Sequence, residues 1–505
     1  MIDSRSRRDF LKVTAGGVVS LAATEMLANA QAPALTATSP KGDINVRITD
    51  KTRKYAGLSP LHWRSSSAGK GDAITIRADK RYQPVLGFGA AFTDAACYMF
   101  NQLAPNARAE LFHELFSPSE MGLSVGRVCI GSSDYSVSVY SYDEGAADPE
   151  LKRFSIDHDR AYILPILTEA RKVNPDLFLL ASPWSPPGWM KSSNTMLGGA
   201  IWRHYFDAYA IYLAMFLQAY KTAGVAINSI TTQNEVDTDQ DGKMPAAMWP
   251  QEFEMDFVRD HLGPKIVAEG LDTKIWLLDH NYSLWGRAVC MLDDPGLRKY
   301  ADGIAWHGYV GTADLMSRVH EYHPDIKMYW TEGGPDITAP DYQTDWCKWS
   351  ATFTDILQNW CRCIIGWNLA LDEKGKPNIG PFPCGGVVTI DSKTHAITRS
   401  GQYWALAHYS RAVKRGAVRV ATESGADAQH VVFANPDGSM AAVITNKGAA
   451  RTVRLRAGDS SAELAMTEDS VATLTWLAGA GNSSPAPPSR GNSERAIALP
   501  SEVPW

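Results

Sequence analysis

The sequence lacks the cysteine and histidine patterns that mark metal or redox enzymes. Its seven cysteines are scattered and odd in number, with no C-x-x-C pair; Cys361 and Cys363 form only a C-x-C spacing. Residues 320–323 read H-E-Y-H, which is too short a spacing to place two histidines on one helix face as H-E-x-x-H does. We therefore expect mostly buried thiols and no bound metal.

Blocks of like charge are missing as well. The 505 residues contain 49 Lys and Arg against 55 Asp and Glu, a formal net charge of −6. A surface that binds nucleic acid or acidic lipid needs a basic cluster, so neither partner is expected. The apolar run 13–23 is too short and too rich in Gly and Ala to span a bilayer. We therefore expect no integral membrane segment.

The first 30 residues resemble an export signal. Residues 6–12 read S-R-R-D-F-L-K, and the apolar run 13–23 and then A-N-A at 28–30 follow. A positive start, a short apolar core and a small-x-small cleavage site define a signal peptide. The paired Arg7 and Arg8 favour the twin-arginine export machinery, which carries folded proteins. We expect a periplasmic or secreted protein cleaved after Ala30; the alternative is an ordinary basic N-terminus on a cytosolic protein.

The middle of the chain, 83–400, alternates apolar strands with amphipathic helical stretches. Helical periodicity is visible over 106–116, 159–173, 203–223 and 250–262. Eight such βα units with nearly continuous apolar strands predict a (β/α)₈ TIM barrel, whose active site lies where the strands end. The predicted strands are 85–92, 123–131, 177–182, 229–236, 274–280, 303–309, 327–331 and 363–371.

Short alternating runs at both ends of the chain predict a second, all-β domain. They occur at 44–49 and 73–77, within 41–82, and at 418–422, 430–434, 441–445, 452–457 and 470–476, within 401–477. The turn N-P-D-G at 435–438 favours a hairpin between two of them. We expect one β-sandwich built from the N-terminal strands and the C-terminal region. Residues 478–505, rich in Gly, Ser, Pro and Ala, predict a disordered tail.

Two of the predicted barrel strands end in a glutamate. The run 229–236 ends in Gln233, Asn234 and Glu235, and the run 327–331 leads into Glu332. Strands four and seven face each other across a barrel mouth, and a retaining glycosidase needs two carboxyl groups about 5 Å apart. Glu235 would then be the general acid/base and Glu332 the nucleophile. On pattern alone, two structural or surface glutamates are an equal alternative.

Several longer motifs resemble glycoside hydrolase family 30, in particular its glucosylceramidase branch. They follow one another in the family's order from the first strands to about residue 476. They are L-G-F-G-A-A-F-T-D at 86–94, S-S-D-Y at 132–135, A-S-P-W-S-P-P-G-W-M-K at 181–191, Q-N-E at 233–235, H-G-Y at 307–309, T-E at 331–332 and G-W-N-L-A-L at 366–371.

The resemblance implies a retaining β-glycosidase with no metal or organic cofactor, and it implies roles for individual residues. Glu235 matches the acid/base and Glu332 the nucleophile, with Glu332 ionised and Glu235 protonated until it acts. In that family, the sugar next to the scissile bond is held by residues at four positions. The matching residues in this chain are Asp134, Trp184, Asn234 and Trp367. Arg127, His307 and Tyr309 match family residues that pack around the nucleophile. For Arg127, a purely structural role as a buried ion-pair partner is an equal alternative.

The substrate expected from the resemblance is a glycoside or glycolipid. The first hypothesis is a glucosylceramidase or β-glucosidase that works by double displacement through a covalent glycosyl-enzyme intermediate. The second is another family-30 specificity, a β-xylosidase or β-1,6-glucanase, and the third is a carbohydrate-binding protein without activity. The loop 378–386 departs from the animal glucosylceramidases, which leaves the leaving group open.

Overall fold

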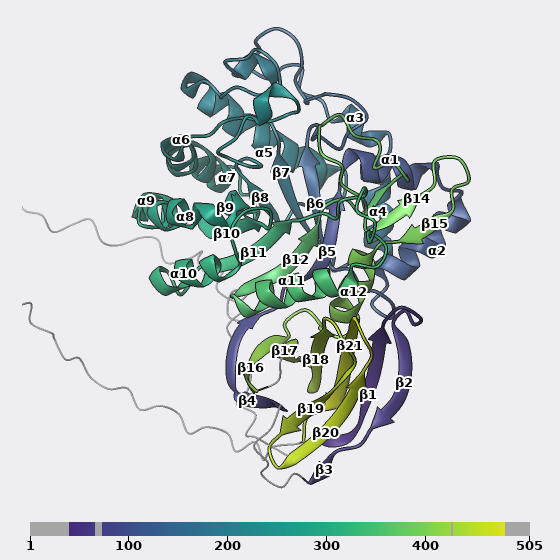
Figure 1. The fold of residues 1–505 in the computed structure, drawn as a ribbon. Helices are drawn as coiled ribbons and strands as arrows, with labels where there is room; N and C mark the ends of the chain where they lie inside the picture. Colours follow the sequence, from purple (N-terminus) through teal and green to yellow (C-terminus); the bar gives the residue numbers. More distant parts are fainter. Residues whose placement is uncertain (1–39, 66–72, 426–427, 480–505) are drawn as a thin grey trace, which may run out of the picture. The chain divides into compact units, whose positions relative to one another are not determined.

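The computed structural model describes residues 40–65, 73–425 and 428–479 (Figure 1). The predicted signal peptide and nearly all of the predicted disordered tail lie outside these residues. Within the described ranges, no helix combines the length and the apolarity needed to cross a membrane.

The centre of the molecule is a closed barrel of eight parallel strands (Figure 1), in agreement with the predicted fold. Its strands are buried over most of their length, because helices cover the outer face and side chains fill the inside. In chain order they are β5 (Gly87–Phe92), β6 (Val125–Ile130), β7 (Phe178–Pro183), β8 (Ser229–Thr231), β9 (Lys274–Asn281), β10 (Ala301–His307), β11 (Lys327–Glu332) and β12 (Cys361–Gly366).

Helices pack around the barrel, and several of them bury one side. In α4, for example, Ile163, Leu167 and Ala170 are buried and recur at helical spacing. The helices are α1 (Asp94–Gln102), α2 (Pro105–Phe116), α3 (Asp157–Arg160), α4 (Ile163–Val173), α5 (Phe206–Thr222), α6 (Gln251–Asp256), α7 (Gly263–Ala268), α8 (Trp285–Leu292), α9 (Pro295–Arg298), α10 (Asp314–Tyr322), α11 (Trp346–Gln358) and α12 (Gly401–Ser410).

Two barrel strands end five residues earlier than predicted. Strand β8 stops at Thr231, and Glu235 adopts a left-handed φ of 53° in the segment that follows. Strand β12 stops at Gly366, and Asn368 has a φ of 59°. The chain then forms a small sheet of β13 (Ala370–Leu371), β14 (Val388–Ile390) and β15 (Ile397–Arg399). Both deviations turn the backbone at the barrel mouth, where side chains must point into the cavity.

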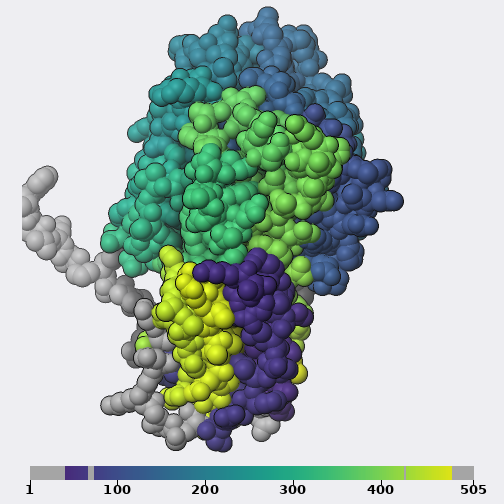
Figure 2. Space-filling model, turned by 45° about the vertical axis from the view of Figure 1, so that its right-hand side comes forward, coloured from purple at the N-terminus to yellow at the C-terminus, as the bar shows by residue number. Residues whose placement is uncertain are grey.

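The first and last strands of the described residues pair in the second domain. Strand β1 pairs antiparallel with β21, and Figure 2 shows the purple N-terminal and yellow C-terminal strands side by side. The sheet runs in the order β2-β1-β21-β18-β17-β16-β4-β19-β20-β3. Its strands are β1 (Lys41–Thr49), β2 (Ala56–Leu61), β3 (Arg64–Ser65), β4 (Ala73–Pro84), β16 (Val418–Ser424), β17 (Gln429–Ala434), β18 (Ser439–Asn446), β19 (Arg451–Ala457), β20 (Ser460–Met466) and β21 (Ser470–Leu477).

This sheet encloses its own apolar core, as expected of a β-sandwich. Alternate residues of its strands, such as Ile44 and Val46 in β1 and Val453 and Leu455 in β19, are buried in one cluster. The predicted turn at 435–438 joins β17 to β18, with Gly438 at a φ of 83°. The sequence pattern did not predict β2 and β20.

Candidate active site

Glu332 ends strand β11 and is held by two donors. A guanidinium nitrogen of Arg127 donates to its Oε2, and the Tyr309 hydroxyl donates to its Oε1 at 3.1 Å. Arg127 has no exposed surface, and the Glu332 side chain is 7% exposed. A permanent positive charge thus lies against this carboxylate in a nearly dry environment, where electrostatic interactions are strong.

Arg127 also fixes the groups on either side of Glu332. Its guanidinium donates to Asn234 Oδ1 and to Asp279 Oδ2, both at 2.7 Å, and to Ser182 Oγ at 3.1 Å. Burial by itself would lower the pKa of Arg127, but Asp279 and Glu332 outweigh burial and raise it. Arg127 is therefore both a buried ion-pair partner and the group that orients Asn234 and Glu332.

Asp279 is a buried anion beneath the cavity. Besides Arg127, it accepts hydrogen bonds from the hydroxyls of Thr231 and Thr331, each at 2.7 Å, and it pairs with His307 Nε2 at 3.1 Å. Burial by itself would raise the pKa of Asp279, but Arg127 and His307 hold it well below its usual range. No sequence motif assigned a role to Asp279.

His307 lies between the two glutamates. Its Nδ1 is 3.3 Å from Glu235 Oε1, and its Nε2 is 3.9 Å from Glu332 Oε2. Burial alone would lower the pKa of this imidazole, but Glu332, Asp279 and Glu235 together raise it to about 9. His307 therefore carries a positive charge at neutral pH.

Glu235 lies four residues beyond the end of β8, and three polar side chains surround its carboxylate. His307 Nδ1 is 3.3 Å and His280 Nδ1 3.7 Å from its Oε1, and Gln240 donates to its Oε2 at 2.7 Å. Burial by itself would raise the pKa of Glu235, but the interactions with His307, His280 and Gln240 lower it overall. This differs from the expectation that the resting site keeps Glu235 protonated near neutral pH; two histidines favour its ionised form.

Two tryptophans predicted to hold the sugar stack on each other. The rings of Trp184 and Trp367 are 5.1 Å apart with an interplanar angle of 18°. The guanidinium carbon of Arg127 lies 4.6 Å from the Trp184 ring centroid. This arrangement forms a rigid aromatic wall beside the carboxylates.

Asp134 lies in the same cavity with an unsatisfied oxygen. Its Oδ1 is buried and has no hydrogen-bond partner among the described residues. Burial, with the nearby carboxylates of Glu332 and Glu235, raises the pKa of Asp134 well above its ordinary value. A buried oxygen without a partner is costly, so it is suited to a ligand hydroxyl.

These side chains surround one cavity of about 480 Å³, large enough for a sugar ring and part of a leaving group. Of the predicted site residues, Asp134, Trp184, Asn234, Glu235, Tyr309, Glu332 and Trp367 line it. Arg127 and His307 are fully buried and contact the lining residues from below. The cavity is also lined by residues that the sequence did not single out, among them Gln240, His280, Phe382 and Cys384.

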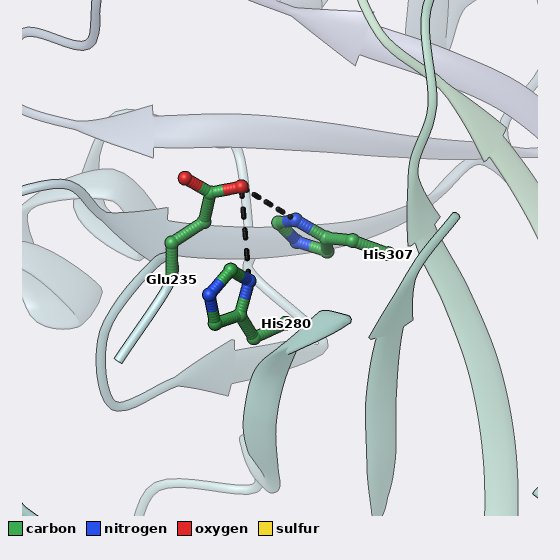
Figure 3. A group of neighbouring side chains, drawn as sticks. All are labelled: Glu235, His280 and His307. Carbon is green, nitrogen blue, oxygen red and sulfur yellow. Dashed lines mark hydrogen bonds and ion pairs between the residues drawn. The ribbon is translucent and has the colours of Figure 1, made fainter. Parts of the chain in front are cut away.

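One group of side chains here has metal-ligand geometry. The ligand atoms of Glu235, His280 and His307 lie within 4.8 Å of one another (Figure 3). No other set of three or more such residues in the described ranges meets this criterion.

A barrel with carboxylates at its strand ends, an aromatic wall and a sugar-sized cavity defines an enzyme that hydrolyses O-glycosyl bonds. Residues 85–413 match the glycosyl hydrolase family 30 TIM-barrel domain, and residues 416–474 match the glycosyl hydrolase family 30 beta sandwich domain. The chain belongs to glycoside hydrolase family 30.

The chain shows comparable sequence identity to relatives that carry the names of two different enzymes. It is 33% identical over 388 residues to an endo-1,6-beta-D-glucanase of Neurospora crassa, covering 73% of this chain and 79% of the relative. It is 27% identical over 406 residues to the lysosomal acid glucosylceramidase of Mus musculus, covering 76% and 79%. The structure of the endo-beta1,6-glucanase BT3312 superimposes with a TM-score of 0.78 at 29% identity, over 86% of this chain and all of that one.

Proposed function

We propose that the protein is a retaining β-glycosidase in which Glu332 is the nucleophile and Glu235 the general acid/base. The observation that carries this proposal is the different environment of the two carboxylates around one cavity. Glu332 faces the permanent charge of Arg127, whereas Glu235 contacts groups that exchange protons, His307 and His280. A nucleophile must be ionised, and an acid/base must gain and lose a proton in each cycle.

The proposed reaction has two displacements. In the first, a Glu332 oxygen forms a bond to the anomeric carbon while the bond to the leaving oxygen breaks and Glu235 gives that oxygen its proton. In the second, Glu235 takes a proton from water, whose oxygen attacks the same carbon and releases Glu332. Asn234, held by Arg127, is placed to bind the sugar 2-hydroxyl, a contact that strengthens in the transition state.

The site assignment is tested with three variants and an aryl β-glucoside. Glu332→Gln should lower kcat/KM more than about ten-thousand-fold, as for other nucleophiles. Glu235→Gln should lower it by roughly 100- to 10,000-fold for leaving groups that need a proton. Glu321→Gln, an exposed glutamate on α10, is the matched control and should match wild type. Activity retained in Glu332→Gln would refute the site assignment. No activity in wild type would favour the third hypothesis, a carbohydrate-binding protein without catalysis.

For specificity, we propose a β-glucosyl bond to an apolar aglycone, as in glucosylceramide. The support lies at the cavity mouth, where Phe382 and Tyr309 leave 42% and 45% of their surface exposed. Exposed aromatic side chains beside a polar cavity suit a substrate with a sugar at one end and an apolar group at the other.

The second candidate is an endo-acting β-1,6-glucanase, favoured by the Neurospora crassa relative and by the similarity to BT3312. Glucosylceramide, an aryl β-glucoside, an aryl β-xyloside and a β-1,6-glucan should be compared side by side. Release of ceramide supports the first candidate, whereas fast glucan cleavage without ceramide release supports the second. Phe382→Ser should raise KM for the lipid only, and Val267→Ser, an exposed control on α7, should not.

We also propose that the protein is exported by the twin-arginine machinery. The support is the sequence of residues 6–30 alone. Full-length protein should reach the periplasm or medium of a cell with this machinery, shortened at its N-terminus, and Arg7→Lys with Arg8→Lys should hold it in the cytoplasm. Export unchanged in the double variant would contradict the proposal.

A further inference from the structure

Three ligand atoms converge on one point beside the cavity. His307 Nδ1 lies 3.3 Å and His280 Nδ1 3.7 Å from Glu235 Oε1, and Figure 3 shows both rings turned toward this oxygen. Bond lengths of about 2.0–2.1 Å around a tetrahedral zinc ion put neighbouring donors about 3.3 Å apart. All three ligand atoms lie within 4.8 Å of one another, so shifts of the side chains would bring them to the spacing that zinc needs.

The opposite nitrogen of each imidazole is held by a carboxylate. His280 Nε2 pairs with Asp237 Oδ1 at 2.5 Å, and His307 Nε2 pairs with Asp279 Oδ1 at 3.1 Å. Carboxylate–histidine pairs of this kind orient metal-binding histidines and make them better ligands. The two Nδ1 atoms are thereby left facing Glu235.

His280 also has an unsatisfied atom that points to a ligand. Its imidazole is 7% exposed, yet Nδ1 has no hydrogen-bond partner in the described part of the chain. A buried polar atom without a partner is unfavourable, and a cation at this position would satisfy it. Glu235 lines the cavity, so the fourth coordination position is open to water.

We propose that Glu235, His280 and His307 form a binding site for a borderline divalent transition ion such as Zn²⁺, which reversibly inhibits the enzyme. Two nitrogen donors and one oxygen donor suit Zn²⁺, Cu²⁺ or Ni²⁺ and not Mg²⁺ or Ca²⁺, which prefer oxygen donors only. Binding would displace protons from the imidazoles and engage the Glu235 carboxylate, which could then no longer protonate the leaving group.

Inhibition by Zn²⁺ rests on the proposed role of Glu235 as general acid/base, whereas Zn²⁺ binding does not. Binding and inhibition are therefore measured separately. Full-length protein freed of metal with a chelator is titrated calorimetrically with ZnCl₂ and with MgCl₂. We expect one Zn²⁺ per chain, no Mg²⁺ binding, and a higher melting temperature with Zn²⁺, because an ion that binds the folded state stabilises it. Hydrolysis of an aryl β-glucoside should fall over the same Zn²⁺ range and recover when chelator is added.

Variants decide whether the trio is the site. His280→Asn and Glu235→Gln should each weaken Zn²⁺ binding at least tenfold, whereas His204→Asn, which removes an exposed histidine, should bind Zn²⁺ like wild type. Melting without metal checks that each variant is folded. Zn²⁺ binding unchanged in both ligand variants, or no Zn²⁺ binding by wild type, would overturn the proposal. Binding without inhibition would overturn the inhibitory role and count against Glu235 as the acid.

Discussion

Arg127 shows how one side chain can organise residues from several strands. It comes from β6 and binds Ser182 of β7, Asp279 of β9 and Glu332 of β11, as well as Asn234, which follows β8. Two of these partners are carboxylates, so the cation and the two anions compensate one another where little of their surface is exposed. Removing the cation leaves two buried negative charges close together.

Replacing Arg127 should therefore affect stability as well as activity. Arg127→Met should lower the free energy of unfolding by about 3–5 kcal/mol, the usual cost of breaking a buried ion pair. Arg77→Met, which breaks an exposed pair with Glu423, is the matched control and should cost about 0–1 kcal/mol. Urea unfolding of both variants measures the difference. Equal destabilisation would show that the buried pairs are not what holds this site together.

The pKa of Glu235 leads to a prediction about pH. The two histidines hold the pKa of this carboxyl below its ordinary value, so the protonated acid is present only toward acidic pH. For leaving groups that need a proton, kcat/KM should rise as the pH falls through neutrality. His280→Asn removes a side chain that lowers the pKa of Glu235, so the pH at which activity falls by half on the alkaline side should move upward.

That shift is measured as a pH–rate profile in buffer containing a chelator. His204→Asn serves as the control and should leave the profile in place. A substrate with a very good leaving group should show a weaker dependence, because its departure needs less protonation. An alkaline limb that does not move in His280→Asn would mean that this histidine does not act on Glu235.

At the scale of whole elements, α12 joins the barrel to the sandwich through a buried histidine. His408 Nε2 lies 2.9 Å from the Thr49 hydroxyl of β1, and Nδ1 lies 2.8 Å from the Thr473 hydroxyl of β21. Burial, with a further contribution from Arg411, lowers the pKa of His408 to about 3. This side chain is therefore neutral in the folded protein.

The contribution of His408 to the free energy of unfolding should fall as the pH is lowered. The unfolded chain binds a proton at His408 below about pH 6.5, the ordinary value, whereas the folded chain does not until about pH 3. Stability from this group is thus present above pH 6.5 and is lost as the pH falls toward 3. His408→Gln should show a smaller loss of unfolding free energy between pH 7 and 4 than wild type, by urea unfolding at each pH. Parallel losses would contradict the assignment.

The eight barrel strands follow from local pattern, because buried strands read as apolar runs. The same pattern places Glu235 and Glu332 near the ends of two of these strands. The lengths of β8 and β12 do not follow from it: β8 ends at Thr231 and β12 at Gly366, and left-handed residues follow at Glu235 and Asn368. Strand β20 was missed because S-S-A-E-L-A-M lacks β-branched residues, and β2 because A-G-L-S-P-L contains Gly and Pro.

For the molecule as a whole, the family resemblance implied roles for single residues but not the contacts among them. Nothing in the sequence shows that Asp279 would lie beneath both Arg127 and His307, because these residues are far apart along the chain and meet only when the barrel closes. The same holds for Gln240 and His280 beside Glu235. The electrostatics of Glu235 therefore depend on contacts that only the folded barrel creates.

The central claim is that Glu332 forms a covalent bond to the sugar. A 2-deoxy-2-fluoro-β-glucosyl fluoride slows both displacements but keeps a good leaving group, so the intermediate should accumulate. We predict that one fluoroglucosyl group is added per chain as activity is lost, and that mass spectrometry of peptides places it on Glu332. Glu235→Gln should still be labelled, because fluoride leaves with little need of a proton. Inactivation with the label on another residue, or full activity with no label, would contradict the account.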